Sequence, residues 1–336
     1  MPRLLATPDK FRGTLSGPEA AAAMVAPCAA AGWDGEARPI SDGGEGFLDC
    51  FEGRRRTARV TGPLGVPVEA SWLAVEDRER TAVVEMAQAS GLTLAGGAGG
   101  NDPLQASTIG TGQLVAAAVA EGARRVLLGV GGSATTDGGL GAVTALGRGA
   151  RLLGVDLIVA CDVTTRFVDA APLFAPQKGA TAAQVALLSR RLERLAQVYE
   201  ADFGVDVRNL PGGGAAGGLG GGLAAIGATL VPGFEVVAEA LDLAAALEAA
   251  DLVVTGEGFL DELSFAGKAV GGLAALGAAV APGVPVIAVV GDAEPSVTPR
   301  CGVRVVSLVE RFGRTRAMDE TAACLSEVVA GLLAEM

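Results

Sequence analysis

Short apolar runs alternate with segments of helical pattern at the start of the chain. Residues 4–8 (LLATP) form one run, and the alanine-rich segment after Ser16 has the N-cap residue, early proline and acidic first turn that are typical of a helix. A second strand, within EARPISDGGEG, then enters a glycine loop. This strand–helix–strand order predicts parallel strands that carry loops at their carboxyl ends.

The same alternation returns near the end of the chain. The runs DLVVTGEG, VPVIAVVG and VRVVSL are rich in β-branched residues and are separated by helical segments such as KAVGGLAALGAAV. Two strands from the start and three from the end predict a flavodoxin-like parallel sheet with the order 2-1-3-4-5. We therefore predict an α/β fold with a discontinuous, doubly wound domain formed by residues 1–58 and 235–336.

The middle of the chain has a different pattern. ARVTG, VEASWLAV and TAVVEMA lie close together with turn residues between them, which indicates antiparallel strands. TIGTGQLVAAAVAEG predicts a helix, and the strands in RRVLLGVGG and LIVACDV lead into a glycine loop and to Asp162. This mixture predicts a second, mixed α/β domain over residues 59–234, inserted in the first. We expect the active site in the cleft between the two domains.

Residues 211–223 (PGGGAAGGLGGGL) contain eight glycines in thirteen positions. Gly212, Gly214 and Gly217 formally match GxGxxG, but no apolar strand precedes them, and GxxxxGK[ST] is absent from the sequence. Apolar residues continue after them at helical spacing. The stretch therefore predicts a glycine loop that opens a buried helix, either as an anion site that uses amides such as Gly213 and Gly214 or for close packing alone.

Composition and charge exclude several classes of function. The net charge of −12 argues against nucleic-acid or anionic-membrane binding, which needs a basic field. The sequence has no histidine, which excludes Ser-His-Asp hydrolysis, Cys-His chemistry and His-ligated metals. The five cysteines are scattered without a CxxC pair and no signal peptide is expected, which favours a cytoplasmic protein. The apolar stretch 269–291 contains proline and glycine, which argues against a membrane span.

Phosphoryl transfer suits this composition, because it needs positioning, Mg²⁺ held by carboxylates and at most an Asp base. Among 26 basic residues only three are lysines, and Lys10, Lys178 and Lys268 all lie in loop-like contexts. Lysine is a compact point charge suited to phosphate. Each lysine is interpreted either as a ligand residue or as an ordinary surface residue.

Four loops share one pattern, an apolar strand followed by small residues and an acid. They are TPDKFRG, SDGGEG, GVGGSATTDGG and TGEGFLDE. Glycine amides and Ser or Thr hydroxyls can bind phosphate, and carboxylates can hold Mg²⁺ or accept a proton. Any one loop could be a simple turn. Because strand ends of an α/β sheet share one crevice, we predict a common site.

These motifs, with VTGPLG, VEMAQASGL, NDPLQASTIGTGQL, CDV, PQKGAT and GKA, occur in order along nearly the whole chain. Together they resemble the glycerate kinase family, whose bacterial members phosphorylate glycerate from ATP, usually at the 2-hydroxyl. The resemblance implies ATP and Mg²⁺ as cofactors, D-glycerate as substrate and 2-phosphoglycerate as product. Its two-domain α/β architecture agrees with the order of elements predicted above.

The chain departs from the family pattern in three places. The 147–170 region is shorter, TTRFVDAA follows CDV in place of an Asn-Pro-Leu-Gly type of loop, and the FLDELSFA loop leads to Ala266 where the family often has histidine. We expect these places to lie near the site, so they bear on which substrate is accepted.

We assign hypothetical roles to the acids, cations and glycines of these loops. The catalytic candidates are Lys10, Arg12, Asp42, Asp137, Asp261 and Lys268. The candidates for nucleotide binding are Gly131, Gly132, Ser133, Thr135, Lys178, Gly213, Gly214 and Glu257, with Thr136 nearby. The candidate metal ligands are Asp162 and Asp137. For each acid the alternative is a cap of its own loop.

Three other functions stay open at this point. They are a kinase for another small hydroxy acid or one that gives 3-phosphoglycerate, a nucleotide-binding protein without turnover, and a dehydrogenase that rests on the formal GxGxxG. A homodimer is common for soluble enzymes, but no sequence feature demonstrates one.

Overall fold

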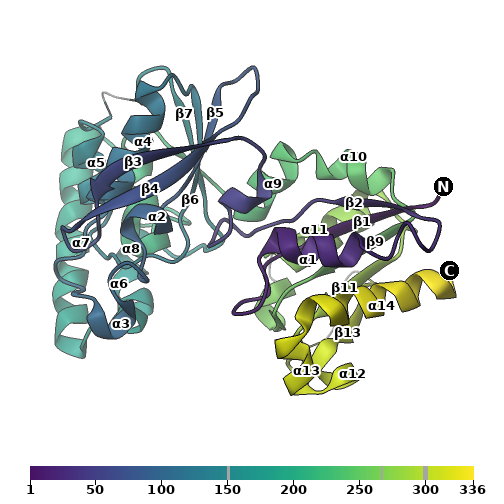
Figure 1. Ribbon diagram of the computed structural model, residues 1–336. Helices are drawn as coiled ribbons and strands as arrows, with labels where there is room; N and C mark the ends of the chain where they lie inside the picture. The colour runs from purple at the N-terminus through teal and green to yellow at the C-terminus, as the bar shows by residue number, and fades with distance from the viewer. Residues whose placement is uncertain (150–151, 266–267, 298–301) are drawn as a thin grey trace. The chain divides into compact units, whose positions relative to one another are not determined.

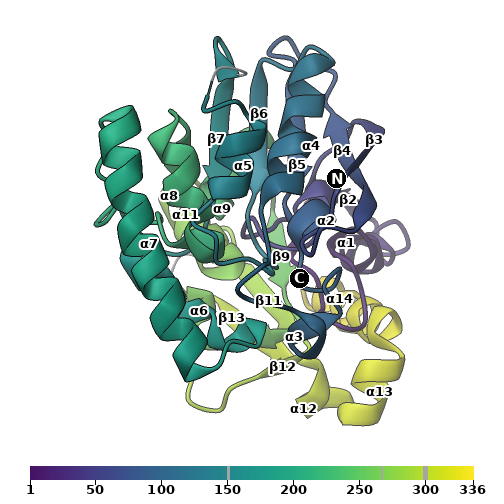
Figure 2. The same cartoon turned by 90° about the vertical axis from the view of Figure 1, so that its left-hand side faces the viewer.

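The computed structural model describes residues 1–149, 152–265, 268–297 and 302–336. The chain divides into two compact units, and Figures 1 and 2 show both. Unit 1 comprises Met1–Asp42 and Phe234–Met336, and unit 2 comprises Gly43–Gly233. Unit 1 is therefore formed by the two ends of the chain.

Unit 1 is built on a five-stranded parallel sheet in the order β13-β11-β9-β1-β2. In chain order this is 2-1-3-4-5, which confirms the predicted flavodoxin-like sheet. The strands are β1 (Arg3–Pro8), β2 (Asp34–Ala37), β9 (Leu252–Gly256), β11 (Val286–Val290) and β13 (Arg304–Ser307). Beyond β2 the chain still follows β1, because Arg38 N donates to Ala6 O at 2.8 Å and Ile40 N donates to Pro8 O at 3.0 Å.

Helices cover both faces of this sheet, and alternate residues of each strand meet different helices. Their bounds are α1 (Gly17–Val25), α9 (Gly233–Ala240), α10 (Leu243–Glu248), α11 (Ala269–Val280), α12 (Leu308–Phe312), α13 (Arg314–Asp319) and α14 (Thr321–Glu335). Leu4 and Val289 pack with α1 and α14, and Figure 1 shows these two helices beside the sheet. Ala288 and Val290 pack with α11 instead. Burial on both faces explains why the three central strands β1, β9 and β11 are apolar almost throughout.

Ser16 begins α1 with a capping box, as its position in the sequence predicts. Its Oγ accepts a hydrogen bond from Glu19 N at 3.4 Å, and Glu19 Oε2 accepts one from Ser16 N at 2.8 Å. The helix start is thereby fixed just after the β1 loop, which carries candidate site residues.

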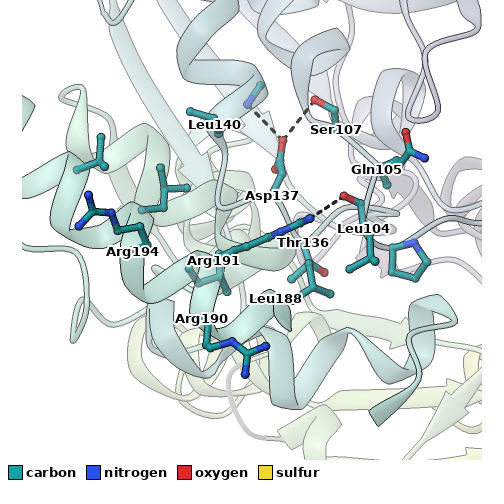
Figure 3. Close-up of a pocket in the computed structure, with 16 residues that line it drawn as sticks. Leu104, Gln105, Ser107, Thr136, Asp137, Leu140, Leu188, Arg190, Arg191 and Arg194 are labelled. Atoms are coloured by element: carbon teal, nitrogen blue, oxygen red, sulfur yellow. Dashed lines mark hydrogen bonds between the residues drawn. The ribbon is translucent and has the colours of Figure 1, made fainter. Parts of the chain in front are cut away.

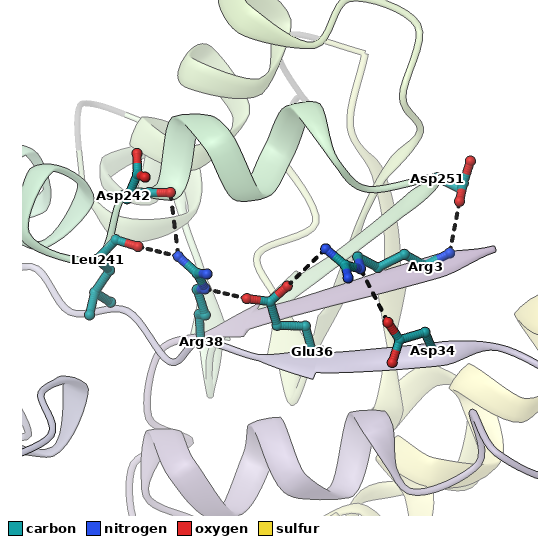
Figure 4. Close-up of polar contacts among 7 residues, drawn as sticks. All are labelled: Arg3, Asp34, Glu36, Arg38, Leu241, Asp242 and Asp251. Atoms are coloured by element: carbon teal, nitrogen blue, oxygen red, sulfur yellow. Dashed lines mark hydrogen bonds and ion pairs between the residues drawn. The ribbon is translucent and has the colours of Figure 1, made fainter. Parts of the chain in front are cut away.

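A chain of polar contacts joins the amino-terminal half of β1 to its neighbours (Figure 4). Arg3 N donates to Asp251 Oδ2 at 2.7 Å, and Arg3 Nε pairs with Asp34 Oδ2 at 3.3 Å. Arg38 Nε pairs with Glu36 Oε1 at 2.5 Å, and its Nη1 donates to the carbonyl of Leu241. Arg3, Asp34 and Asp251 thus lie at the amino-terminal end of the parallel strands, whereas Arg38 follows the carboxyl end of β2.

By length and composition alone, Glu262–Val280 is apolar enough to cross a membrane. Half of the window is buried inside its unit, and α11 contributes Val270, Leu273 and Ala274 to the interior. A core helix passes the same test, and the packing of α11 against the sheet identifies it as one.

Unit 2 is built on a six-stranded mixed sheet in the order β3-β4-β5-β6-β7-β8. The strands are β3 (Arg54–Thr61), β4 (Pro67–Ala74), β5 (Thr81–Glu85), β6 (Arg125–Gly129), β7 (Asp156–Ala160) and β8 (Thr229–Val231). β3, β4 and β5 are antiparallel, and β5 to β8 are parallel. Residues 43–58, predicted to lie in the first domain, lie in unit 2, because β3 pairs with β4 from Arg54 onward.

Helices and 3-10 turns connect the strands of unit 2. The helices are α2 (Ala87–Ser90), α3 (Gly97–Gly100), α4 (Ile109–Ala120), α5 (Leu140–Ala145), α6 (Ala170–Phe174), α7 (Ala182–Phe203) and α8 (Ala215–Ala225). Leu114 of α4, Ala142 of α5 and Leu219 of α8 belong to one buried cluster with the sheet. α7, the longest helix of the unit, buries Leu188, Leu192 and Tyr199 in a second cluster.

The glycine-rich stretch folds as a tight turn and the buried helix α8. Ala216, Gly217 and Gly218 have left-handed backbone angles inside it. A Cβ on Gly217 would lie 2.0 Å from Thr135 O, and one on Gly222 would lie 2.5 Å from Gly138 O. Glycine is therefore required because α8 lies against the backbone of the 130–139 loop.

Candidate functional site

In unit 1, candidate residues meet where β1 and β9 end side by side. The strands stay in register up to Pro8 opposite Gly256. Beyond this point Asp9 N donates to Gly256 O at 2.9 Å, and Gly258 N donates to Lys10 O at 3.3 Å. The TPDKFRG and TGEGFLDE loops therefore share one sheet edge, as the parallel order predicts.

Asp9 and Lys10 form a buried charged pair at this edge. Lys10 Nζ lies 3.5 Å from Asp9 Oδ1, and Asp9 is 8% exposed. Burial raises the pKa of Asp9 to about 6, although Lys10 opposes this rise. Burial lowers the pKa of Lys10, but the carboxylates of Asp9 and Asp42 outweigh it and raise that pKa above its usual value. Lys10 is therefore a cation at neutral pH, and Arg12 and Asp42 lie near enough to affect it.

Glu257 follows β9 directly and has an unusual environment. Its pKa is raised to about 7, chiefly by burial and in smaller part by Asp9 and Asp261, while Ser264 and Lys268 oppose the rise. Its Oε1 is buried and has no hydrogen-bond partner among the described residues. Glu257 is thus a carboxyl group that can gain or lose a proton near neutral pH.

Asp261 organises the turn beside Glu257. Its Oδ1 accepts hydrogen bonds from Ser264 N at 2.9 Å and Ser264 Oγ at 3.2 Å, in the 3-10 turn Glu262–Phe265. Lys268 is the N-cap residue of α11. Ala266 and Gly267, which precede it in the predicted loop, lie outside the described residues. Unit 1 therefore brings together the predicted residues Lys10, Arg12, Asp42, Glu257, Asp261 and Lys268.

In unit 2, the glycine loop after β6 keeps two amides available. Gly131 N donates to Gly43 O at 3.3 Å, and Ala134 N donates to Ser90 O at 3.0 Å. Between them, the amides of Gly132 and Ser133 make no backbone hydrogen bond within the described chain. A Cβ on Gly131 would lie 2.3 Å from Gly44 Cα, so glycine is required there. Two adjacent free amides can bind an anion.

Asp137 is engaged on both carboxylate oxygens. Oδ2 accepts from Thr108 N and Thr108 Oγ1, both at 2.9 Å, from Gly141 N at 3.2 Å and from Ser107 Oγ at 3.4 Å. Oδ1 accepts from Gly139 N at 3.1 Å. These bonds tie the loop to the starts of α4 and α5. Asp137 therefore holds the loop in place, and its oxygens are poorly available to a metal.

Lys178 and Thr135 lie beneath the loop rather than on its surface. Lys178 is 3% exposed, and its Nζ donates to Thr135 O at 2.6 Å. Burial lowers the pKa of Lys178 to about 7, and Asp137 opposes this fall. Thr135 is fully buried, with its Oγ1 3.5 Å from Ala216 O. The alternative that Lys178 is an ordinary surface residue is therefore wrong.

The amides of Gly213 and Gly214 are already engaged. Gly213 N donates to Leu210 O and Gly214 N to Thr165 O, both at 2.9 Å. Close packing, the alternative interpretation of this stretch, accounts for both glycines. Asp162 Oδ1 accepts from Gly233 N at 2.9 Å, which fixes the end of unit 2 to the loop after β7. No cluster of three or more acids or cysteines in the described ranges could hold a metal ion by itself.

Two features were missed from the sequence. Asp9 belongs to the TPDKFRG loop, in which Lys10 and Arg12 are the predicted site residues. Its place directly after β1 is the signal that identifies it. Arg190, Arg191 and Arg194 line a pocket with Asp137 and Thr136. In an arginine-rich chain they resemble any solvated helix face, so the sequence held no signal for them.

Comparisons with known proteins show which proteins this chain is similar to. The model of the glycerate kinase family matches residues 4–152 and 148–336. A glycerate kinase of Halalkalibacterium halodurans is 39% identical over 310 residues, which cover 80% of each chain. A glycerate 2-kinase of Escherichia coli K12 is 38% identical over 304 residues, or 79% of each chain. A crystal structure from Salmonella typhimurium LT2, provisionally assigned as glycerate kinase 2, has a TM-score of 0.84 at 34% identity and covers 99% of both chains.

Proposed function

The chain belongs to the glycerate kinase family, and from this premise we propose that it transfers the γ-phosphoryl group of ATP to the 2-hydroxyl of D-glycerate. As a kinase of this family it is a phosphotransferase that acts on an alcohol group. The choice of the 2-hydroxyl is supported by the relative named glycerate 2-kinase.

The observation that carries this proposal is the group at the ends of β1 and β9. Lys10 provides a fixed cation, and Glu257 provides a carboxyl group whose pKa of about 7 lies near the working pH. A sugar acid carries a carboxylate, which needs a cation, and a hydroxyl, which needs a base to accept its proton. Lys10 and Arg12 would bind the carboxylate, and Arg12 can do so through two hydrogen bonds.

Glu257 is the proposed general base. The unpartnered Oε1 would accept the proton of the attacking hydroxyl while the new O–P bond forms and the bond to the leaving ADP breaks. Asp9 pairs with Lys10 and would keep its ammonium in place. Asp261 and Lys268 would hold the Glu257 loop, Asp261 through Ser264.

The loop after β6 is the proposed site for the ATP phosphates. The amides of Gly132 and Ser133 would donate to phosphate oxygens, and Asp137 would keep the loop in shape. Mg²⁺ would enter with ATP, because its ligands are then mostly phosphate oxygens and water with one or two carboxylates. A site with few protein ligands fits the lack of a three-residue cluster among the described residues. Asp162 remains the candidate carboxylate, whereas the oxygens of Asp137 are occupied.

The test is ADP release from ATP and Mg²⁺ with and without D-glycerate, with the phosphate position read by phosphorus NMR. We expect glycerate-dependent ADP release and phosphate on the 2-oxygen. Lys10→Ala should abolish most of it, whereas Asp34→Asn, an exposed acid at the other end of the same sheet, should not. Folded protein without glycerate-dependent turnover would refute the proposal, and phosphate on the 3-oxygen would refute the regiochemistry.

A further inference from the structure

Unit 2 contains a pocket that the proposed phosphate loop does not use. Its volume is about 660 Å³, within the range of small-molecule sites. Figure 3 shows it between α7, the segment 103–107 and the start of α5. Glycerate, with three carbons, is far too small to fill it.

The walls of the pocket are apolar and its charged side chains are mostly cations. The apolar lining includes Leu104, Leu140, Leu188, Leu192, Leu195 and Val198. Arg190, Arg191 and Arg194 line it from α7, and none of them has a carboxylate partner among the described residues. Arg191 Nη1 donates to Leu104 O at 2.9 Å. Asp137 is the acid in the lining, and its oxygens already accept five hydrogen bonds.

A buried hydroxyl in the lining lacks a partner. Thr136 is 2% exposed, and its Oγ1 has no hydrogen-bond partner in the described chain. An unsatisfied buried hydroxyl costs stability unless a ligand or water satisfies it. Thr136 also stands three residues after Ser133, on the same loop that offers the free amides. The pocket therefore adjoins the proposed phosphate site along the chain.

We propose that this pocket is the adenosine subsite of ATP, an inference that rests on the proposed kinase function. The flat adenine ring would pack between the leucines, since an apolar slot suits a ring with few polar edges. The Thr136 hydroxyl would bond to the ribose or the base. The arginines would face the phosphates that run from the pocket to the glycine loop, because guanidinium groups bind phosphate oxygens well.

Calorimetry with a non-hydrolysable ATP analogue and with inorganic tripolyphosphate tests this subsite. Leu140 is 49% exposed and lines the pocket, so Leu140→Trp should fill it without disturbing the core. We expect at least tenfold weaker binding of the analogue and unchanged binding of tripolyphosphate. Leu173→Trp, at a 60% exposed leucine of α6 outside the pocket, is the matched control and should bind like the wild type.

Two further variants test the polar contacts. Thr136→Val removes only the hydroxyl and should weaken analogue binding about three- to tenfold, the usual effect of one hydrogen bond. Arg194→Ala should weaken it as well, whereas Arg59→Ala, at an exposed arginine of β3, should not.

The outcomes separate this inference from the proposed function. Glycerate-dependent turnover with an unchanged KM for ATP in Leu140→Trp would overturn the subsite and leave the kinase standing. The wild type could bind the analogue without glycerate-dependent turnover, and Leu140→Trp could lose that binding. This pair of results would support the subsite and overturn the kinase function. A wild-type protein that binds no analogue would overturn the subsite directly.

Discussion

Glu257 is the residue whose chemistry differs most from what its sequence position indicates. The sequence placed it among nucleotide ligands, whereas the structure gives it a pKa of about 7 and a buried oxygen without a partner. If it is the base, kcat/KM should rise with pH up to about 7 and then level off. Glu257→Gln should lower kcat about 10²- to 10⁴-fold and leave ATP binding nearly unchanged. A pH–rate series on both proteins checks this, and loss of ATP affinity in equal measure would mark Glu257 as a metal ligand.

The same carboxyl group should make unit 1 sensitive to pH. Its pKa is about 7 when folded and 4.5 ordinarily, so between these values the folded protein holds a proton that the unfolded chain has lost. Wild-type stability from this group is therefore present below pH 4.5 and is lost as the pH rises to about 7. Glu257→Gln keeps a neutral side chain at all pH values. By urea unfolding, it should be more stable than the wild type at pH 8.5 and about as stable as the wild type at pH 4. A variant that is destabilised equally at both pH values would contradict the assignment.

The sequence predicts which loops meet better than it predicts the roles of the residues within them. The acids and cations of the β1 and β9 loops could be predicted because strand order fixes which loops meet. The roles could not be predicted, because they depend on burial. The charges of Asp9 and Lys10 offset each other, whereas Lys178 is buried and donates to the carbonyl of Thr135. In the sequence the two lysines look alike, because each lies in a loop-like context.

Among the elements, α8 shows what the glycine-rich stretch is for. Gly217 and Gly204 have nearly the same backbone angle, φ of 70° and 73°. A Cβ on Gly217 would meet Thr135 O at 2.0 Å, whereas one on Gly204 meets nothing within 4 Å. We therefore expect Gly204→Ala to lower stability by about 1 kcal/mol, the cost of the left-handed angle. Gly217→Ala should cost about 3 kcal/mol or more, because backbone must also move.

Urea unfolding of the two alanine variants makes this comparison. Similar losses would show that the backbone angle, rather than the approach of α8 to Thr135, explains the glycine. The existence of a buried helix here was predicted from apolar spacing. The turn before it could not be placed from the sequence, since its course depends on Phe167 and Gly138, which come from distant elements.

At the scale of the whole molecule, the two tryptophans report on different units. Trp33 is buried in the core of unit 1 with β1 and α14, and Trp72 in that of unit 2 with β6 and α4. A nucleotide analogue that binds unit 2 should raise the thermal midpoint of a protein that keeps only Trp72, because ligand binding stabilises the folded state. Fluorescence melts of Trp33→Phe and Trp72→Phe measure this. A shift seen by Trp33 alone would contradict a nucleotide site in unit 2.

The strand order of unit 1 could be predicted because short connections and helix-separated strands leave few arrangements. The first boundary between the two units could not be predicted, because the exposed arginines at the start of β3 give this segment little of the pattern of a strand. The exposed positions Arg54 and Arg55 look like a loop until β4 is known to pair with them.

The two-ended composition of unit 1 also has a consequence during synthesis on the ribosome. β1 pairs with β2 on one side and, from Leu4 opposite Leu252, with β9 on the other, so β1 emerges well before this second neighbour is made. Unit 2 is complete by Gly233 and can fold in the meantime. Until β9 has emerged, β1 and the apolar side of α1 lack part of the packing that covers them in unit 1, and chaperones that bind exposed apolar segments should bind them during this interval.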